Sequence, residues 1–456
     1  MSDTIAAIAT GGTISAIGII RMSGMDSIAI ADKVFRAYSA ARLTQAKDRQ
    51  MYYGELLDAD GEIIDIVLCV VSRGPNSYTG ENTAEFQCHG SPLVLSEVLK
   101  TLFKHGARQA LQGEFTKRAF LNGRMDLIQA EAVIDLIESE TVPAAQNAAG
   151  QLRGAVGIKL ESAYASLVDI MAHFHAVLDY PDEDIDDFKM AVYLESLCTV
   201  RDELARLLST HERGKIMQIG VPTAIIGRPN TGKSSLLNAL LGYDRAIVTD
   251  IPGTTRDTIE ERVVFGGIAL RLIDTAGLRQ TDDAVEKLGV ERTRLALRDA
   301  GLVIIVLDGS VPLLKEDHEA LSSISQEVPR IAVINKSDLP TAFDADTLDR
   351  FGIDCLRISA QTGDGLSALD AKIRELFPFP ENVPSGEIIT NARQADAISR
   401  ALNNVSHAMD AIAAEVTPDA VLTDIEAALS NIGEVTGKTM REDVISRIFE
   451  RFCVGK

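Results

Sequence analysis

The chain has 456 residues, 46% of them hydrophobic and 24% charged, which is typical of a folded globular protein rather than a disordered one. Its formal net charge of −21 argues against a broad basic face for nucleic acid, so an RNA partner would need local basic spots or a helper protein. There is no apolar run of roughly 18 residues, no signal-peptide pattern and no cysteine spacing typical of a disulfide framework. We therefore expect a cytoplasmic protein without a membrane partner, built from roughly two to four domains.

Four segments follow one another along the chain. Residues 1–120 mix short β-like runs with turn clusters, and residues 121–216 have the apolar periodicity of helices. Residues 217–380 alternate strand, loop and helix, which predicts an α/β domain with a mostly parallel sheet. Residues 381–456 are helical again. The predicted fold class is multidomain: a mixed α/β N-terminal domain and a helical domain interrupted by an inserted α/β P-loop domain, although two separate helical pieces would give the same pattern.

The strongest local signal is a glycine-rich loop between an apolar run at 223–226 and a predicted helix at 235–241. Residues 227–234 match G-x-x-x-x-G-K-S in the context which that motif requires. Its backbone N–H groups and the helix N-terminus can surround phosphate oxygens. Lys233 would bind the β- and γ-phosphates and Ser234 a Mg²⁺ ion; the alternative is a structural turn. The phosphate contacts predicted here are Asn230, Thr231, Gly232, Lys233, Ser234 and Ser235.

Further short motifs follow in the order that GTP hydrolysis needs. Thr255 can offer a hydroxyl to Mg²⁺, Asp274 can hold a water on the metal, and the N–H of Gly277 can meet the γ-phosphate. The carboxylate of Asp338 can accept two N–H bonds from guanine, which adenine does not offer, and Ser359-Ala360 can bring an N–H to the guanine oxygen. Together these motifs predict a GTP hydrolase. The remaining predicted GTP contacts are Thr249, Asp250, Ile251, Pro252, Gly253, Thr254, Thr255, Asp274, Thr275, Ala276, Gly277, Asn335, Lys336, Ser337, Asp338, Ser359 and Ala360.

Two residues refine the expected mechanism. Leu278 stands where related enzymes use a glutamine to orient the attacking water, so another polar group must do this. Glu286 is the nearest candidate, and the alternative is an exposed helix glutamate. Asn230 is either a turn former or a ligand of a monovalent cation, and K⁺ beside the phosphates would supply positive charge during hydrolysis.

The end of the chain predicts an anchored tail. Thr439–Glu442 has the pattern of a capping box, followed by an amphipathic helix. The helix should fix the position of the last four residues, which offer the thiol of Cys453 and the ammonium of Lys456. The predicted apolar face consists of Met440, Val444, Ile445, Ile448, Phe449 and Phe452.

With these motifs the chain resembles the tRNA wobble-uridine modification GTPases, the MnmE (TrmE) family, over nearly its whole length. Beyond the GTPase motifs, the resemblance rests on residues 18–21, 74–81, 87–90, 113–115, 118–122, 180–183 and the terminal Cys453-Val454-Gly455-Lys456.

The resemblance implies several properties that the motifs alone do not. Residues 1–120 would bind formyl-tetrahydrofolate and form a homodimer, with Arg21, Glu85, Arg124 and Lys456 at the folate. K⁺ held by Asn230, Thr249, Ile251 and Thr254 would promote hydrolysis, Glu286 would position the water, and hydrolysis would drive conformational change. With an FAD-dependent partner, in a heterotetramer, the enzyme would add an aminomethyl-type group to the wobble uridine of tRNA, and Cys453 would serve this chemistry.

Three positions depart from the family pattern: residues 10–14 lack a proline pair, Arg124 replaces an expected lysine, and Pro252 lies in the K⁺ loop. Two other functions are compatible with the motifs. One is a ribosome-assembly GTPase that switches without covalent chemistry, although such proteins usually carry a basic appendage. In the other, folate chemistry is primary and GTP only regulates it.

Overall fold

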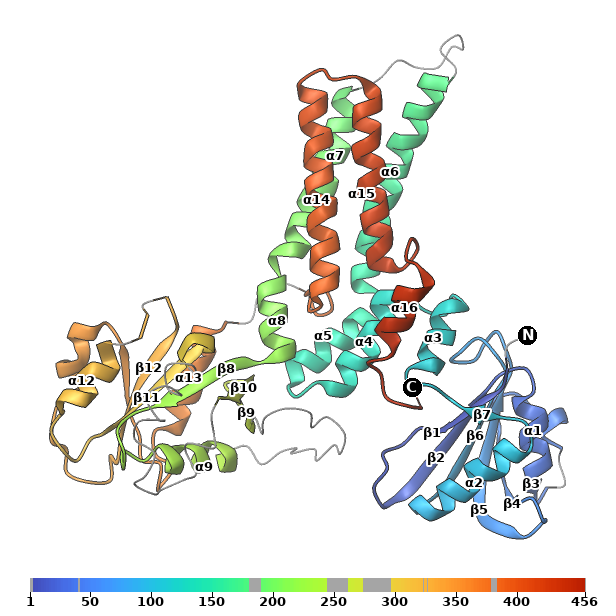
Figure 1. Cartoon of the computed structure of the whole chain (residues 1–456), viewed down its shortest axis with the longest axis horizontal. Helices are drawn as coiled ribbons and strands as arrows, with labels where there is room; N and C mark the ends of the chain where they lie inside the picture. Colours follow the sequence, from blue (N-terminus) through green and yellow to red (C-terminus); the bar gives the residue numbers. More distant parts are fainter. Residues whose placement is uncertain are drawn as a thin grey trace. The chain divides into compact units, whose positions relative to one another are not determined.

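The chain folds into more than one compact unit (Figure 1). The computed structural model describes residues 3–39, 42–179, 190–243, 261–273, 297–322, 324–325, 327–378 and 384–455. One unit contains residues 1–134, 151–205 and 397–456, and the other contains residues 135–150 and 206–396. The multidomain prediction is therefore confirmed.

A seven-stranded sheet forms the N-terminal part of the first unit. Its strand order is β3-β4-β5-β6-β2-β1-β7, antiparallel except for the parallel pair β1 and β7. Three of its strands, β2, β5 and β6, contain short β-like runs of the kind expected in residues 1–120. The strands are β1 (Ile5–Ile8), β2 (Ser15–Ser23), β3 (Phe35–Ala37), β4 (Met51–Leu57), β5 (Ile63–Ser72), β6 (Thr83–Gly90) and β7 (Arg108–Gln109).

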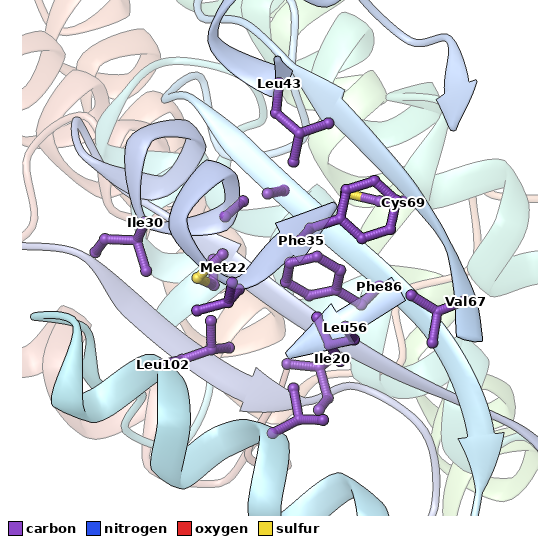
Figure 2. Close-up of a cluster of buried hydrophobic side chains, with 14 of the residues drawn as sticks. Ile20, Met22, Ile30, Phe35, Leu43, Leu56, Val67, Cys69, Phe86 and Leu102 are labelled. Atoms are coloured by element: carbon purple, nitrogen blue, oxygen red, sulfur yellow. The ribbon is translucent and has the colours of Figure 1, made fainter. Parts of the chain in front are cut away.

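One face of this sheet is covered by α1 (Ser27–Val34) and α2 (Pro92–Lys104), and side-chain alternation along the strands sets which residues lie beneath them. In β5, Val67, Cys69 and Val71 are buried in this core. Figure 2 shows Phe35 and Phe86 at its centre, with Ile20, Met22 and Leu102 nearby.

The opposite face of the sheet is partly open. Tyr53 and Leu68 are paired across β4 and β5, and their side chains are exposed in this chain. Met51 and Ile66 on the same strands are exposed as well. The sheet therefore has one buried face and one face with accessible apolar side chains.

Helices form the rest of the first unit. Polar pairs link neighbouring long helices: His173 of α6 bonds Tyr193 of α7, and Arg400 of α14 pairs with Glu434 of α15. Pro418 begins α15 and Gly437 ends it with positive φ, as expected for a helix start and a left-handed cap. These helices are α3 (Glu114–Leu121), α4 (Leu127–Glu138), α6 (Ala155–Asp179), α7 (Met190–Ser209), α14 (Ala392–Ala413), α15 (Pro418–Thr436) and α16 (Glu442–Phe449). The helices α5 (Val142–Leu152) and α8 (His211–Ile219) lie wholly or mostly in the second unit.

The predicted capping box before α16 is wrong. The helix begins at Glu442 after Arg441, and no side-chain cap bond forms there. Thr439 Oγ1 donates instead to the carbonyl of Ser430, 2.9 Å away in α15. Val444 is 39% exposed and does not belong to the buried face. The other expected members of that face, Met440, Ile445, Ile448, Phe449 and Phe452, are buried or partly buried in one cluster.

The second unit contains a six-stranded sheet of order β13-β12-β11-β8-β10-β9, parallel except for the β9–β10 hairpin. Apolar clusters cover both of its faces, as expected for a mostly parallel sheet. Ligands of such sheets bind at the carboxyl ends of the strands. The strands are β8 (Val221–Ile226), β9 (Glu261–Phe265), β10 (Ile268–Leu272), β11 (Leu302–Asp308), β12 (Arg330–Asn335) and β13 (Asp354–Arg357), and the helices include α9 (Lys233–Tyr243), α12 (Lys315–Ser322) and α13 (Leu366–Leu376).

Candidate functional site

The glycine-rich loop lies at the carboxyl end of β8 and leads into α9, as the sequence predicts. It turns sharply, because Gly227, Asn230 and Gly232 all have positive φ, of 150°, 63° and 94°. A Cβ on Gly232 would lie 2.1 Å from Nδ2 of Asn335, so this close approach requires glycine. The sequence thus dictates a narrow loop whose backbone can surround a small anion.

Lys233 holds the loop from inside. Its Nζ donates to the carbonyl oxygens of Gly227 and Arg228, at 2.9 and 2.7 Å. Burial lowers the pKa of the Lys233 ammonium, because desolvation disfavours the charged form. A bound phosphate would give this ammonium an anionic partner. Ser234 and Ser235 lie in the first turn of α9.

A second group of predicted residues meets where β12 and β13 end. Asp338 Oδ1 accepts a 2.6 Å hydrogen bond from Ser359 Oγ, and Asn335 Oδ1 accepts a 2.9 Å bond from the N–H of Ala360. Ser337 N–H donates to the carbonyl of Ile358, 3.0 Å away. The structure therefore brings together the two motifs predicted to bind guanine, although they are separated along the chain.

Asn335 also joins this group to the loop. Its Nδ2 donates to the carbonyl of Thr231, 2.9 Å away, and both residues are buried. Segments predicted to bind the base and the phosphates are thus in direct contact, which is the geometry a single nucleotide requires.

Asp308 is a residue of this region that sequence reasoning missed. Its Oδ2 lies 2.6 Å from Nζ of Lys336. Burial acts to raise the pKa of Asp308, but hydrogen bonds from Lys336 and Ser310 outweigh it and hold the pKa below its usual value. The available signal was its position directly after the apolar strand run Leu302–Leu307.

Several predicted residues lie outside the described part of the chain, and their geometry stays a prediction. They are Thr249, Asp250, Ile251, Pro252, Gly253, Thr254, Thr255, Asp274, Thr275, Ala276, Gly277, Glu286 and Lys456.

A separate group of predicted residues lies on the N-terminal sheet. Arg21 of β2 pairs with Glu85 of β6, with 2.6 Å between Nε and Oε1. The guanidinium of Arg21 lies 5.5 Å from the ring centre of Tyr78, a residue that was not singled out. The Cγ and Cδ atoms of the Arg124 side chain lie next to Gly80, which is two residues after Tyr78. The loop carrying Tyr78 and Gly80 thus connects the three predicted residues.

The C-terminal tail runs along the N-terminal sheet. The N–H of Gly113 donates to the carbonyl of Cys453, 3.2 Å away, and Val454 forms a β-bridge with Gln112. A Cβ on Gly455 would lie 2.3 Å from the carbonyl of Ile8, so the backbones are in close contact. The thiol of Cys453 is exposed. The expected fixed position of the tail is confirmed as far as residue 455.

A parallel sheet with this loop at the end of its central strand defines a P-loop nucleotide-binding protein. The family model described as "MnmE helical domain" matches residues 127–453, and the model "GTP-binding protein TrmE N-terminus" matches residues 4–124. The chain therefore belongs to the MnmE family of tRNA modification GTPases and is itself a tRNA modification GTPase.

Curated relatives match over the full length. Proteins named tRNA modification GTPase MnmE are 43% identical in Thermoanaerobacter pseudethanolicus, 42% in Symbiobacterium thermophilum and 40% in Clostridioides difficile. Each match covers 100% of this chain, and 99%, 99% and 100% of the respective relative. In the described part of the chain, no helix is both long and apolar enough to cross a membrane.

Proposed function

We propose that GTP binds across the two contacting segments of the second unit, and that its hydrolysis drives a conformational change used in tRNA modification. The observation that carries this proposal is the hydrogen bond between Asn335 and Thr231, because it joins the predicted base and phosphate segments. Lys233 would exchange its loop carbonyls for the β- and γ-phosphates. Ser234 would hold Mg²⁺ together with Thr255.

The base and the attacking water have separate sets of residues in this proposal. Asp338 accepts the two guanine N–H groups, and the N–H of Ala360 approaches the guanine oxygen. Asn230 binds K⁺ with Thr249, Ile251 and Thr254, and its exposed position on the loop supports this role. Glu286 orients the water, because Leu278 has no group that can do so.

The N-terminal sheet is proposed to bind formyl-tetrahydrofolate. Arg21 and Arg124 offer cationic donors, Glu85 an acceptor, and Tyr78 an aromatic surface next to Arg21. An electron-rich heterocycle with amide-like edges matches this donor and acceptor set. Lys456 would join the same site, since the tail that precedes it lies along this sheet.

We also propose the domain division 1–120, 121–216, 217–380 and 381–456, with the α/β domain inserted into the helical one.

The accessible apolar face around Tyr53 and Leu68 supports homodimerisation of the N-terminal domain, since such a face is normally covered. An FAD-dependent partner would complete a heterotetramer. Within it, an aminomethyl-type group derived from the folate one-carbon unit would be added to the wobble uridine of tRNA in the cytoplasm, with Cys453 in the chemistry.

Mass analysis of wobble uridine tests this function. A deletion strain should lack the modification, and the wild-type chain should restore it. Cys453→Ser should keep normal GTP hydrolysis but fail to restore the modification, whereas Cys198→Ser, at another non-buried cysteine, should restore it. Restoration by Cys453→Ser would remove this thiol from the mechanism. A ribosome-assembly function would instead leave wobble uridine unchanged in the deletion strain.

Calorimetry tests the folate site. The full chain should bind formyl-tetrahydrofolate, and Arg21→Ala should weaken binding by about tenfold, the loss expected for one charge-assisted contact. Arg36→Ala is the matched control. Arg36 also pairs with a strand glutamate, Glu55, but this pair joins β3 and β4 at one edge of the sheet, away from β2 and β6. Equal binding by the wild type and Arg21→Ala would contradict the assignment.

A further inference from the structure

Arg228, the residue after the first glycine of the phosphate loop, is anchored at both its backbone and its side chain. Its carbonyl accepts hydrogen bonds from Thr231 Oγ1 at 3.0 Å and from Lys233 Nζ at 2.7 Å. Its Nε donates to Oδ1 of Asp317, 2.7 Å away. The loop is therefore tied to a residue that lies 89 positions further along the chain.

Asp317 is a buried carboxylate in the first turn of α12. Its side chain is 2% exposed and that of Arg228 is 18% exposed. The second oxygen of Asp317 accepts the N–H of Leu314 at 2.9 Å, which fixes the carboxylate relative to the start of the helix. A buried carboxylate needs a partner, and a pair this far removed from water strongly constrains both groups.

The Arg228–Asp317 pair affects the conformation of the phosphate loop when a nucleotide binds. Lys233 has to leave the carbonyls of Gly227 and Arg228 in order to bind phosphate, so two hydrogen bonds that shape the free loop are lost. The Thr231 bond to Arg228 and the Arg228–Asp317 pair do not involve Lys233, so they can persist. A loop that keeps its shape loses less entropy on binding.

We propose that Asp317 is a positioning residue for nucleotide binding: through Arg228 it keeps the phosphate loop in its binding conformation while Lys233 changes partners. This inference rests on the proposed assignment of residues 227–234 as the phosphate loop. Among the described residues, the pair binds the loop and the start of α12 rather than the base segment, so it acts on nucleotide affinity and leaves the hydrolysis step unchanged.

The test is a titration of full-length, nucleotide-free protein with fluorescent GDP, together with GTP hydrolysis at saturating GTP. Asp317→Asn and Arg228→Met should each raise the Kd by about tenfold, whereas kcat should stay within about twofold. The double variant should bind about as weakly as either single variant, because both changes remove the same interaction. Lys315→Gln is the matched control on the same helix, since its pair with Glu319 is exposed, and it should bind as the wild type does.

Separate outcomes distinguish the positioning role from the site itself. Lys233→Ala should lose GDP binding. If it does, and Asp317→Asn and Arg228→Met bind normally, the positioning proposal is wrong and the loop assignment stands. Normal binding by Lys233→Ala would overturn the loop assignment and the inference with it. Additive losses in the double variant, or a loss of kcat at unchanged Kd, would also overturn the inference. Arg228→Lys keeps the positive charge. Its Kd for fluorescent GDP is measured instead if Asp317→Asn does not fold.

Discussion

Asn335 Nδ2 donates a 2.9 Å hydrogen bond to the backbone carbonyl of Thr231. Asn335 ends strand β12, and Thr231 lies in the loop between β8 and α9. Because of this contact, a movement of the phosphate loop would also displace the residues proposed to bind the base. Base and phosphate recognition should therefore be coupled in this enzyme.

Asp338→Asn should change which base is bound. The carboxylate that would accept two guanine N–H groups becomes an amide, so the GDP affinity should fall by at least about tenfold. Xanthine carries an oxygen where guanine carries its amino group, so the amide can donate to it and the variant should prefer the xanthine nucleotide. Competition between the two nucleotides measures this, and an unchanged preference for GDP would place base recognition elsewhere.

Hydrolysis should depend on K⁺. A cation held by Asn230 beside the phosphates stabilises charge in the transition state, so GTP turnover should be at least about tenfold faster in KCl than in NaCl at equal ionic strength. Asn230→Ala should remove most of this difference. Equal rates of the wild type in the two salts would contradict the proposal.

Glu286→Ala should separate binding from hydrolysis. Loss of the group that orients the water should lower kcat by about 100-fold, the usual contribution of a positioned general base. GDP affinity should not change, because this residue is not expected to touch the bound nucleotide. Glu319→Ala, at an exposed glutamate of α12, is the control. A wild-type rate in Glu286→Ala would identify Glu286 as an ordinary surface residue.

The N-terminal ion network should make stability depend on acid pH. Arg108 bonds both Asp3 and Glu114, and its hydrogen bond is the main reason why the pKa of Asp3 lies below the usual 3.8. Burial acts to raise the pKa of Glu114, but bonds from Arg108, Leu111 and Arg118 outweigh it and hold the pKa below 4.5. Both carboxyls therefore contribute stability above these values and lose it as the pH falls through their lowered pKa values.

Arg108→Met tests this network. At pH 7 the variant should be less stable than the wild type by roughly 1 kcal/mol, because Arg108 and Asp3 are partly exposed and solvent screening reduces the roughly 1.5–3 kcal/mol expected for hydrogen bonds to charged groups. The difference should shrink as the pH falls below 4.5 and then below 3.8, the usual pKa values of the two carboxyls. Denaturant unfolding across this range measures it, and a difference that does not vary with pH would assign the effect to packing.

The sequence predicted those parts of the site that are determined locally. The loop from Gly227 to Ser234 could be recognised because its spacing of glycines, lysine and serine is contiguous. The Arg228–Asp317 pair could not, because the two residues are 89 positions apart, Arg228 stands at a position that the motif leaves open, and Asp317 belongs to no motif. The same holds for Tyr78, whose ring meets Arg21 only after β2 and the loop before β6 are folded.

The fold was predicted well where patterns were periodic and poorly where a tertiary contact competed with a local one. A short β-like run in residues 1–120 forms β5, whose buried residues are Val67, Cys69 and Val71. At the start of α16 a local cap was expected, but Thr439 bonds Ser430 of the preceding helix. Such competition between local and distant partners for one hydroxyl cannot be decided from spacing alone.

The chain segments that lead into and out of the six-stranded sheet are joined to each other. Thr210 Oγ1 accepts the N–H of Ile389 at 2.9 Å, and a Cβ on Gly214 would lie 2.0 Å from the carbonyl of Ile389. Arg206 and Glu387 form an ion pair of 2.6 Å beside them. A domain whose two ends meet in this way can be gained, lost or exchanged in a single genetic event, because the host needs only to close a short gap. The contacts around Ile389 therefore hold together the two ends of the domain that we propose to be inserted, so an excised copy of that domain would have its two new chain ends close together.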